Sequence, residues 1–492
     1  MQTKLMNNKV FIGNDFEESQ YLWLIPIVNG YCRKRNINEL IFEKKINFKI
    51  INNSIIKNIL SNYKIYYLGN KNKYFFYKVY LVIINLFYII YYSIRINRKN
   101  ILNPKNSWKT TQLLHSIWDL SLILSQGLDP NFFYRFKAAS ICFVRKSIAK
   151  DIYKKKTVTA FLGHSVYSSR ALISELRGYN IKIFNQANFN IHRQLKFKDS
   201  SWSIVDNKII EKFEHLITSR NINQYFKKRI LGKGYYEDSK IALIIKKNKI
   251  NVNHDNVILL HIFKDSPFNL IDTKRIFVDY VEWIAETLKI ITLSKEKWVL
   301  RIHPNFKRWG ENSFKITDLI VKQKLCLKNL PSNIIIEKPH LRSNLELFKN
   351  VKRLITFSGT SHLESACFGV KPIVISKTTL GEYNKNAVFK PLNYNEYYDL
   401  LIKNNEKKYF SLPDPIIKQA KLLLFIRENI LSIKNDLNGL SLYRSDKNKI
   451  RSRNFINISN KLHSNLNYLD LVGSKLSNGL THSLSKKYIN FF

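Results

Sequence analysis

The chain has 492 residues, enough for at least two domains with hydrophobic cores of their own. It carries 81 lysines and arginines against 36 aspartates and glutamates, a formal net charge of +45. The positive charge is spread along the sequence and no nucleic-acid-binding motif is present, so we do not expect nucleic acid as a partner. The charge favours an anionic membrane surface or a phosphorylated substrate, although the heavy use of Lys, Asn and Ile also fits a coding bias.

Two features bear on the compartment. The four cysteines are far apart and lack metal-ligand spacing, which predicts a reducing cytoplasm with neither disulfides nor a zinc site. No apolar stretch directly follows Met1, so no signal peptide is expected. The sequence therefore predicts a cytoplasmic protein, and peripheral attachment to the inner face of the plasma membrane stays open.

The first half of the chain alternates short apolar runs with helical patterns, which predicts a parallel β-sheet. Strands are expected at 9–12, 40–43, 65–68, 157–162 and 181–184. A helix is expected over 15–35, with Pro26 as a kink or an interruption. A Lys- and Asn-rich stretch at 233–256 then predicts the connection between two domains.

Residues 79–94 form an uncharged, Tyr-rich run with Lys78 before it and Arg95 after it. The run is shorter than the roughly 18–20 residues that span a bilayer, and Asn85 interrupts it. Three interpretations stay open. The run is an interfacial helix in the headgroup region, a helix buried in the core, or a spanning segment.

Three sets of residues in the first half are candidates for acid–base catalysis. His164 follows a predicted strand, at the carboxyl end where open α/β sheets place their ligands. His115 and Asp119 lie four residues apart on a predicted helix, a spacing that can hold an imidazole in one tautomer. Asp15 and Glu17 follow the first strand. The alternative is structural, since a lone histidine or a His–Asp contact is more often part of the core or the surface.

A second α/β series begins after the connection. Strands are expected at 257–263, 298–302, 333–337, 353–357 and 373–375, with a helix over 274–288. From residue 436 the chain becomes polar and rich in Asn, Ser and Lys. We therefore predict a Rossmann-like N-terminal acceptor domain at 1–240, a Rossmann-like C-terminal donor domain at 250–435, and a loosely packed, partly disordered appendage at 436–492.

The stretch 353–375 has the strongest functional pattern. Its first strand is followed by small and hydroxyl-bearing residues, namely Ser358, Gly359, Thr360 and Ser361. A helix expected over 362–368 would expose unpaired N–H groups beside these hydroxyls, an arrangement that favours an anion such as phosphate. Glu364, one turn further on, is placed to accept a hydrogen bond from a sugar hydroxyl. The alternative is an ordinary strand–helix–strand crossover with a hydroxyl N-cap and no ligand.

Several local strings occur along the chain in an order and spacing that carry more information than any one of them. In the first half they are Glu39-Leu-Ile-Phe-Glu43, His115-Ser-Ile-Trp-Asp119 and Gly163-His164. In the second half they are His261-Ile-Phe-Lys-Asp-Ser-Pro267, Phe277-Val-Asp-Tyr-Val-Glu-Trp283, Trp298 to Pro304, Phe357-Ser-Gly-Thr360 and Gly369-Val-Lys-Pro-Ile-Val374. Over about residues 8–430 the chain resembles bacterial capsule and surface-polysaccharide glycosyltransferases. The resemblance implies a GT-B fold, in which two Rossmann-like domains face a cleft.

The resemblance also implies the donor site. In the related capsule sialyl- and Kdo-transferases, a His-Pro motif and a Ser/Thr-rich loop hold the donor phosphate. The matching residues here are His303, Pro304, Ser358, Gly359, Thr360 and Ser361, with Glu364 at a commonly acidic position, Arg301 where the family often has lysine, and Asp265 at an earlier strand end. No acidic pair of the type that anchors a sialyltransferase base is evident, so the base stays open among the residues named above.

The activity implied by the resemblance is transfer of a sugar from a nucleotide-activated donor to a surface polysaccharide or a lipid-linked acceptor. We expect no cofactor besides that donor and no metal, because no Asp-X-Asp string lies near a strand end. Two alternatives stay open, a transferase with a CDP-polyol donor and a non-catalytic assembly protein of the same fold. A nucleotide-sugar 2-epimerase shares the fold, but the acidic Arg-Pro-Glu string usual after its Gly-Lys-Pro segment has no counterpart here.

Overall fold

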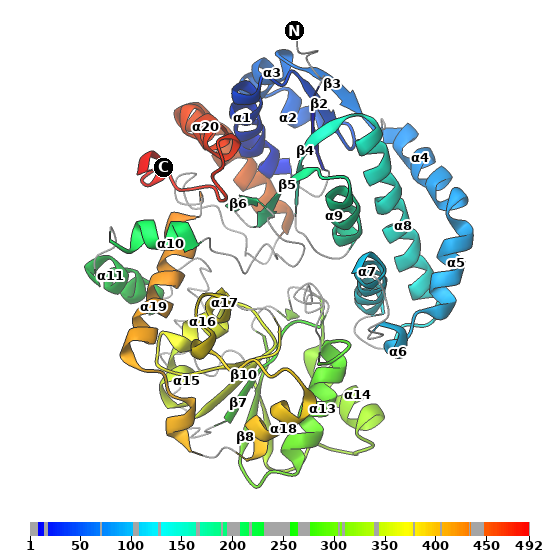
Figure 1. The fold of residues 1–492 in the computed structure, drawn as a ribbon. Helices are drawn as coiled ribbons and strands as arrows, with labels where there is room; N and C mark the ends of the chain where they lie inside the picture. Colours follow the sequence, from blue (N-terminus) through cyan, green and yellow to red (C-terminus); the bar gives the residue numbers. More distant parts are fainter. Residues whose placement is uncertain are drawn as a thin grey trace.

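In the computed structural model the chain folds into two α/β units, each built around its own sheet (Figure 1). The structure describes residues 8–13, 18–68, 71–101, 108–125, 129–163, 168–187, 190–193, 207–215, 219–230, 256–263, 276–303, 306–307, 310–338, 344–376, 379–403, 406–431, 433 and 447–491. The predicted α/β class, with two Rossmann-like units as in the GT-B type, is confirmed.

The N-terminal sheet has the strand order β3-β2-β1-β4-β5-β6, in which only β6 is antiparallel to its neighbour. Its strands are β1 (Lys9–Ile12), β2 (Glu39–Phe42), β3 (Lys64–Tyr67), β4 (Thr157–Leu162), β5 (Lys182–Ala187) and β6 (Asn190–Arg193). The helices of this half are α1 (Glu18–Arg35), α2 (Phe48–Ile51), α3 (Ser54–Ser61), α4 (Lys71–Ile84), α5 (Leu86–Arg95), α6 (Arg98–Ile101), α7 (Trp108–Leu124), α8 (Phe132–Lys154), α9 (Ser168–Gly178), α10 (Asn207–Glu214) and α11 (Ser219–Ile230). The predicted helix over 15–35 therefore runs through Pro26 without interruption.

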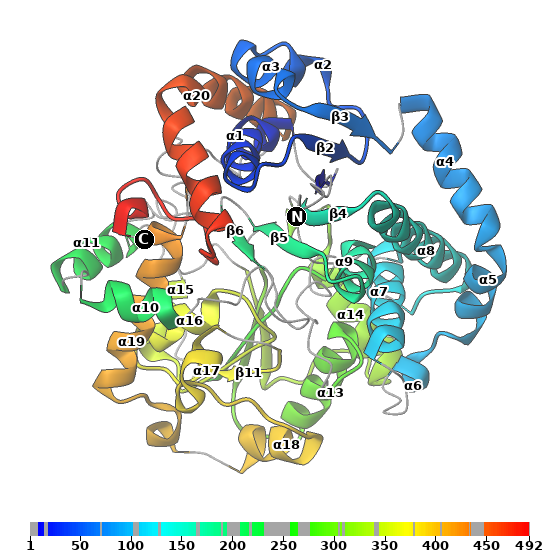
Figure 2. The same cartoon turned by 45° about the horizontal axis from the view of Figure 1, so that its top comes forward.

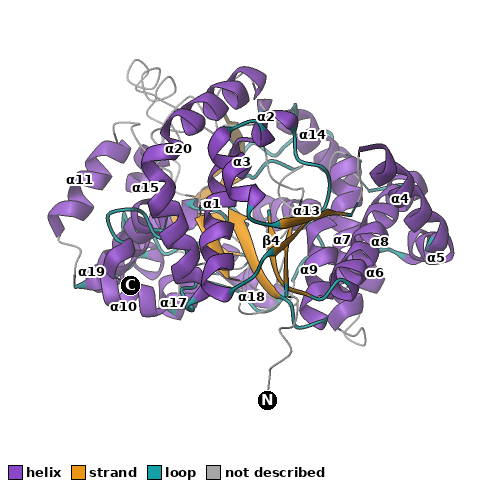
Figure 3. Ribbon diagram, turned by 90° about the horizontal axis from the view of Figure 1, so that it is seen from above, coloured by secondary structure: helices purple, strands orange, loops and turns teal. Residues whose placement is uncertain are grey.

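Both faces of this sheet are covered by helices, because successive residues of a strand point to opposite sides and the central strands carry apolar residues on both. On β1, Val10 and Ile12 belong to the core cluster that includes α1 and α3. Phe11 belongs to the cluster that includes α8 and α9. Figure 3 shows the resulting helices on either side of the strands.

The C-terminal sheet is entirely parallel, with the order β11-β10-β7-β8-β9. Its strands are β7 (Asn256–Leu259), β8 (Trp298–Arg301), β9 (Ile334–Glu337), β10 (Arg353–Thr356) and β11 (Ile373–Val374). The helices of this half are α13 (Tyr280–Thr292), α14 (Ser313–Lys324), α15 (Asn344–Asn350), α16 (Ser361–Ala366), α17 (Thr379–Tyr383), α18 (Tyr394–Ile402) and α19 (Asp414–Phe425). The order places β7 at the centre, between β10 and β8.

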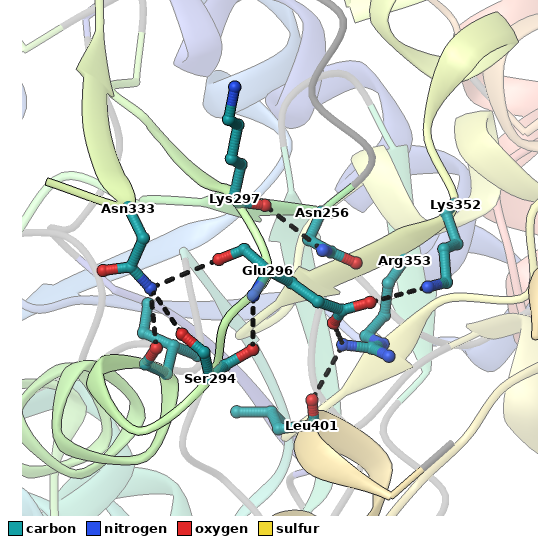
Figure 4. A network of polar contacts seen from close by, with 9 residues as sticks. Asn256, Ser294, Glu296, Lys297, Asn333, Lys352, Arg353 and Leu401 are labelled. Atoms are coloured by element: carbon teal, nitrogen blue, oxygen red, sulfur yellow. Dashed lines mark hydrogen bonds and ion pairs between the residues drawn. The ribbon is translucent and has the colours of Figure 1, made fainter. Parts of the chain in front are cut away.

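A buried ion network fixes the amino ends of these strands (Figure 4). Glu296 accepts from Lys352 and from Arg353, each at 2.7 Å, and the Arg353 guanidinium also donates to the Leu401 carbonyl. Arg353 is fully buried, so its charge depends on Glu296 for compensation. The network ties the loop before β8 to the start of β10. It lies at the edge of the sheet opposite the carboxyl ends of the strands.

The C-terminal segment returns to the N-terminal unit as the long helix α20 (Lys447–Ser477), which lies against α1 (Figure 2). Its buried apolar residues recur at helical spacing, namely Leu462, Leu469, Val472 and Leu476. Polar residues that look solvated in the sequence make contacts instead, since Asp470 accepts from Asn29 and from Arg33 on α1. The expectation of a loosely packed segment is therefore wrong for the part from Ile458 to Ile489, which contributes buried side chains to the core.

Several contacts join the two units in the described part of the chain, and one of them is an ion pair between Lys324 on α14 and Asp129. Trp118 on α7 donates a hydrogen bond to Asp279, the N-cap of α13, at 3.1 Å. Tyr225 on α11 packs edge-on against Phe425 on α19. The Ser485 amide donates to the Ile430 carbonyl, so the segment after α20 also reaches the π-helical turn Ile426–Ile430 that follows α19.

Residues 79–94 form parts of two helices, α4 and α5, rather than one. No single helix in the described part of the chain is both long and apolar enough to cross a membrane. The pair 73–84 and 86–95 meets those criteria only together, with a bend of 65° at Asn85. The interpretation as a core helix is wrong for much of the run, because Ile83, Phe87 and Ile94 are each more than 60% exposed.

The contact between α1 and α20 requires glycine on both helices. A Cβ at Gly473 would lie 1.8 Å from the Ile27 carbonyl oxygen, and one at Gly30 would lie 1.8 Å from the Asp470 carbonyl oxygen. We expect Gly473→Ala to lower the free energy of unfolding by about 1–3 kcal/mol, because the new methyl group would overlap the backbone of α1, which cannot shift without moving the helix. Thermal denaturation measures this. Asn467→Ala, at an exposed position on the same helix, is the control. An unchanged melting temperature for Gly473→Ala would contradict the packing.

Candidate functional site

Three neighbouring strands of the C-terminal sheet deliver polar residues to one edge. β10 is followed by Ser358, β7 by His261 and β8 by His303. Because the strands are parallel and adjacent, their carboxyl ends meet at the same edge, which is where open α/β sheets bind ligands. The central strand places His261 between the other two residues.

Two contacts hold this cluster together. His261 Nε2 lies 2.6 Å from the Ser358 carbonyl oxygen, and the rings of His261 and His303 are nearly parallel with centroids 6.2 Å apart. The His261 amide also donates to the Tyr280 hydroxyl at 2.5 Å. His261 therefore links the loop after β10 to the end of β8.

Gly359 permits the approach of the loop to His261. Its φ of +96° lies in the left-handed region, and a Cβ there would be 2.9 Å from His261 Cε1. Any other residue would push the imidazole away from the Ser358 carbonyl. Glycine at this position is thus explained by a specific contact.

Ser358 presents an unsatisfied hydroxyl. The residue is 3% exposed, and within the described part of the chain its Oγ has no hydrogen-bond partner. Leaving a buried hydroxyl unpaired costs about 1–3 kcal/mol, so such a group is a candidate for contact with a ligand. Thr356 donates to the Ser358 carbonyl at 2.9 Å, which fixes the backbone beside that hydroxyl.

The two imidazoles are neutral at ordinary pH. Burial lowers the pKa of His261, and the hydrogen bond to the Ser358 carbonyl opposes that shift only in part. Desolvation, with a smaller effect from His261, lowers the pKa of His303 to about 3. Since a carbonyl only accepts, His261 carries its proton on Nε2 and leaves Nδ1 as an acceptor. The cluster therefore offers hydrogen bonds to a ligand without a fixed positive charge from histidine.

The loop continues into α16, which is shorter than the sequence predicts. Thr360 is the N-cap, although its side chain caps no N–H group, and Ser361 begins the helix. Both residues are partly exposed, whereas Glu364 is largely buried and lies in the first turn. Six residues give a weak helix dipole, so hydroxyl and imidazole groups contribute more to this edge than the dipole does.

Arg301 is engaged in the fold. Its guanidinium makes a buried ion pair with Glu337 on the neighbouring strand β9 and donates to the Lys338 carbonyl at 3.0 Å. Most of its charge is therefore compensated inside the sheet. Its predicted direct contact with a donor phosphate stays untested.

His115 and Asp119 lie on α7, the helix that contacts the C-terminal unit through Trp118. Both are buried, and Asp119 makes an ion pair with Arg170 on α9 at 3.1 Å. The carboxylate thus has a strong partner other than the imidazole that the spacing predicts. The remaining candidates lie outside the described residues, namely His164, Asp15, Glu17, Pro304 and Asp265.

His261 is the site residue that sequence reasoning missed. The sequence pattern places it inside the strand expected over 257–263, whereas β7 ends at Leu259 and leaves His261 beyond its carboxyl end. The same position argument that favoured His164 applies to it. Within the described residues no group of three or more His, Cys, Asp or Glu side chains could hold a metal ion.

Comparisons with known proteins give no family. No family model matches the chain, and no curated protein matches it. Among solved structures it is similar to the UDP-GlcNAc 2-epimerase of Methanocaldococcus jannaschii in complex with UDP-GlcNAc and UDP, at 16% identity and a TM-score of 0.29, over 85% of this chain and 100% of that one.

Two other solved structures are glycosyltransferases. KpsC of Thermosulfurimonas dismutans, a beta Kdo 2,4 transferase, is 10% identical with a TM-score of 0.29, over 56% of this chain and 81% of that one. The glycosyltransferase SnogD from Streptomyces nogalater is 9% identical with a TM-score of 0.21, over 85% of this chain and 99% of that one. Similarities at this level do not indicate a function for this chain. A functional proposal therefore has to rest on the geometry of the site.

His362 on α16 gives a pH-dependent test of this region. Burial lowers its pKa to about 3, and the charge of Arg427 adds to the shift. In the unfolded chain its pKa is about 6.5, so between those values the unfolded state binds more protons and stability falls as the pH falls. His362→Gln should reduce the loss of melting temperature between pH 7 and pH 4.5. The exposed His463→Gln is the control, and equal slopes for wild type and His362→Gln would contradict the burial.

Proposed function

We propose that the carboxyl edge of the C-terminal sheet binds the phosphates of a nucleotide-activated sugar, and that the chain transfers that sugar. The buried and unpaired Ser358 hydroxyl, beside His261 and His303, is the observation that carries the proposal. A phosphate oxygen is a suitable acceptor for a hydroxyl that lacks a partner. Thr360 and Ser361 would add donors from the partly exposed side of the loop.

The proposed chemistry follows from where charge develops. When the bond between the sugar and the nucleotide breaks, negative charge grows on the departing phosphate. Donors already fixed in position stabilise that charge without reorganisation. The Ser358 hydroxyl and an N–H of neutral His303 would serve in this way. His261 would act as a positioning residue, because its proton is used on the Ser358 carbonyl.

The N-terminal unit would supply the acceptor side. His164, His115 with Asp119, and Asp15 or Glu17 remain the candidates for the base that removes the proton of the acceptor hydroxyl. Of these, His115 and Asp119 are on the helix that touches the C-terminal unit. The acceptor is proposed to be a surface polysaccharide or a lipid-linked sugar, reached from the cytoplasmic face of a membrane. The reaction is proposed to need no metal.

Ser358→Ala tests the phosphate site directly. We expect it to weaken binding of the preferred nucleotide by about ten- to a hundredfold, because one hydrogen bond to a charged group contributes about 1.5–3 kcal/mol. Isothermal titration with UDP, CDP and CMP measures this. Ser365→Ala is a matched control, since that buried hydroxyl already donates to the His362 carbonyl. Equal affinity of wild type and Ser358→Ala would remove the hydroxyl from the site.

The titrations also separate the alternatives. Selective binding of CDP would indicate a transferase with a CDP-polyol donor. The absence of any nucleotide binding would indicate a non-catalytic assembly protein. Chelation of divalent cations should leave the affinity unchanged.

His303→Ala tests turnover. It should lower the rate of donor hydrolysis or transfer far more than it lowers the melting temperature, because His303 is partly exposed and lies beyond the end of β8 rather than inside it. His303→Gln, which keeps an N–H donor, should recover part of the rate. A rate equal to that of wild type in His303→Ala would exclude His303 from the site.

A further inference from the structure

The outer surface of α4 and α5 is apolar and exposed. Twelve large apolar side chains on these helices are 39% to 76% exposed: Phe75, Phe76, Val79, Tyr80, Ile83, Ile84, Leu86, Phe87, Tyr88, Ile90, Tyr91 and Ile94. We call this set the α4–α5 surface. All three ribbon views place both helices at the outer side of the N-terminal unit, with α8 on their inner side (Figures 1, 2 and 3). Contiguous apolar surface on this scale marks an interaction site.

The inner side of the same helices is firmly packed. Tyr77 donates a hydrogen bond to Asp151 on α8, and Asn85 donates to Ser147 at 3.0 Å. Tyr92 packs against Phe143 with ring centroids 5.5 Å apart. The outward direction of the α4–α5 surface is therefore fixed by the fold, and repacking one helix would break these contacts.

The charged residues of the segment that carries the α4–α5 surface all have one sign. Between residues 71 and 101 there is no Asp or Glu, and the charged residues are Lys71, Lys73, Lys78, Arg95, Arg98 and Lys99. Lys78 lies over the ring of Tyr74 and Arg95 over that of Tyr91, at 4.7 and 5.1 Å from the centroids. Cations beside exposed aromatic rings fit the headgroup region of a membrane with anionic lipids.

The dimensions fit a helix pair that lies on a membrane rather than across it. α4 has 14 residues and α5 has 10, which correspond to lengths of roughly 21 and 15 Å. The hydrocarbon core is about 30 Å thick, and the two helices are bent by 65°. Neither helix alone could cross it.

A second copy of the chain is a poorer occupant. In a two-fold dimer the same surface meets itself, so the basic residues of one copy would face those of the other. The chain as a whole carries a net charge of +45, which adds to the repulsion. An anionic lipid surface has the complementary sign.

We propose that the α4–α5 surface docks in the plane of an anionic lipid membrane, with its aromatic and aliphatic side chains in the headgroup region. Binding combines burial of apolar side chains with attraction between the flanking lysines and arginines and the lipid charges. Docking in this form does not depend on catalysis.

A buried contact connects this surface to the edge of the N-terminal sheet. Glu43 follows β2, at the carboxyl edge of the sheet. It accepts a hydrogen bond from the Tyr74 hydroxyl on α4. Its two carboxylate oxygens also accept from the Arg145 guanidinium on α8, at 2.7 and 2.9 Å. Glu43 is 1% exposed, so the link is rigid. If the proposed transfer function holds, docking would bring the acceptor side of the enzyme to the lipid surface, which fits a lipid-linked acceptor.

Flotation of the full chain with vesicles tests the proposal. Wild type should bind vesicles of phosphatidylglycerol and phosphatidylcholine, and bind vesicles of phosphatidylcholine alone much less. A variant with Phe76→Ser, Ile83→Ser, Phe87→Ser and Ile94→Ser should bind the anionic vesicles at least tenfold more weakly. These four residues are each more than 60% exposed, so the melting temperature should change little. The control is Leu293→Ser with Leu392→Ser, which are 72% and 77% exposed on the other unit and should leave vesicle binding unchanged.

Three outcomes would overturn the docking proposal. In the first, the variant with four substitutions binds anionic vesicles as well as wild type does. In the second, wild type does not bind anionic vesicles. In the third, wild type is a dimer in solution and the variant with four substitutions is a monomer. Resistance of the membrane-bound protein to extraction at alkaline pH would contradict an orientation in the plane of the membrane. Nucleotide affinity, measured in the same variant, should equal that of wild type. Failure of docking and failure of the phosphate site are thereby distinguished.

Discussion

The hydrogen bond from His261 Nε2 to the Ser358 carbonyl is the contact on which the candidate site depends. It joins two strand ends that are more than 90 residues apart in sequence, and it fixes the tautomer of the imidazole. It forms only because Gly359 lacks a Cβ. Directly beside it lies the Ser358 hydroxyl, which the rest of the described chain leaves without a partner. These three features together are the basis of the proposed phosphate site.

The remainder of the fold supports that edge from a distance. The Glu296–Arg353 pair anchors β10 at its amino end, so the loop at the other end starts from a fixed strand. α20 completes the N-terminal unit by packing against α1, and Trp118 connects α7 to the cap of α13. The two units are thus held by contacts that are remote in sequence, which the proposed transfer would require if donor and acceptor groups come from different units.

The sequence predicts the α/β class and most strands because their apolar runs are short and bounded by polar residues. β1 and β4 have the predicted bounds. The packing of α20 was missed because its apolar positions are separated by many Asn and Ser residues. The exposure of 79–94 was undetermined because both sides of these helices are apolar, and only the fold shows which side is buried. His261 was missed because a single histidine carries little information until its neighbours are known.

A structure of the chain with the nucleotide that binds most tightly is the most direct test of the central claim. The account predicts a phosphate oxygen within hydrogen-bond distance, about 2.5–3.0 Å, of Ser358 Oγ, with an imidazole N–H of His303 directed at the same diphosphate. A nucleotide bound elsewhere, with the Ser358 hydroxyl still buried and untouched, would contradict it.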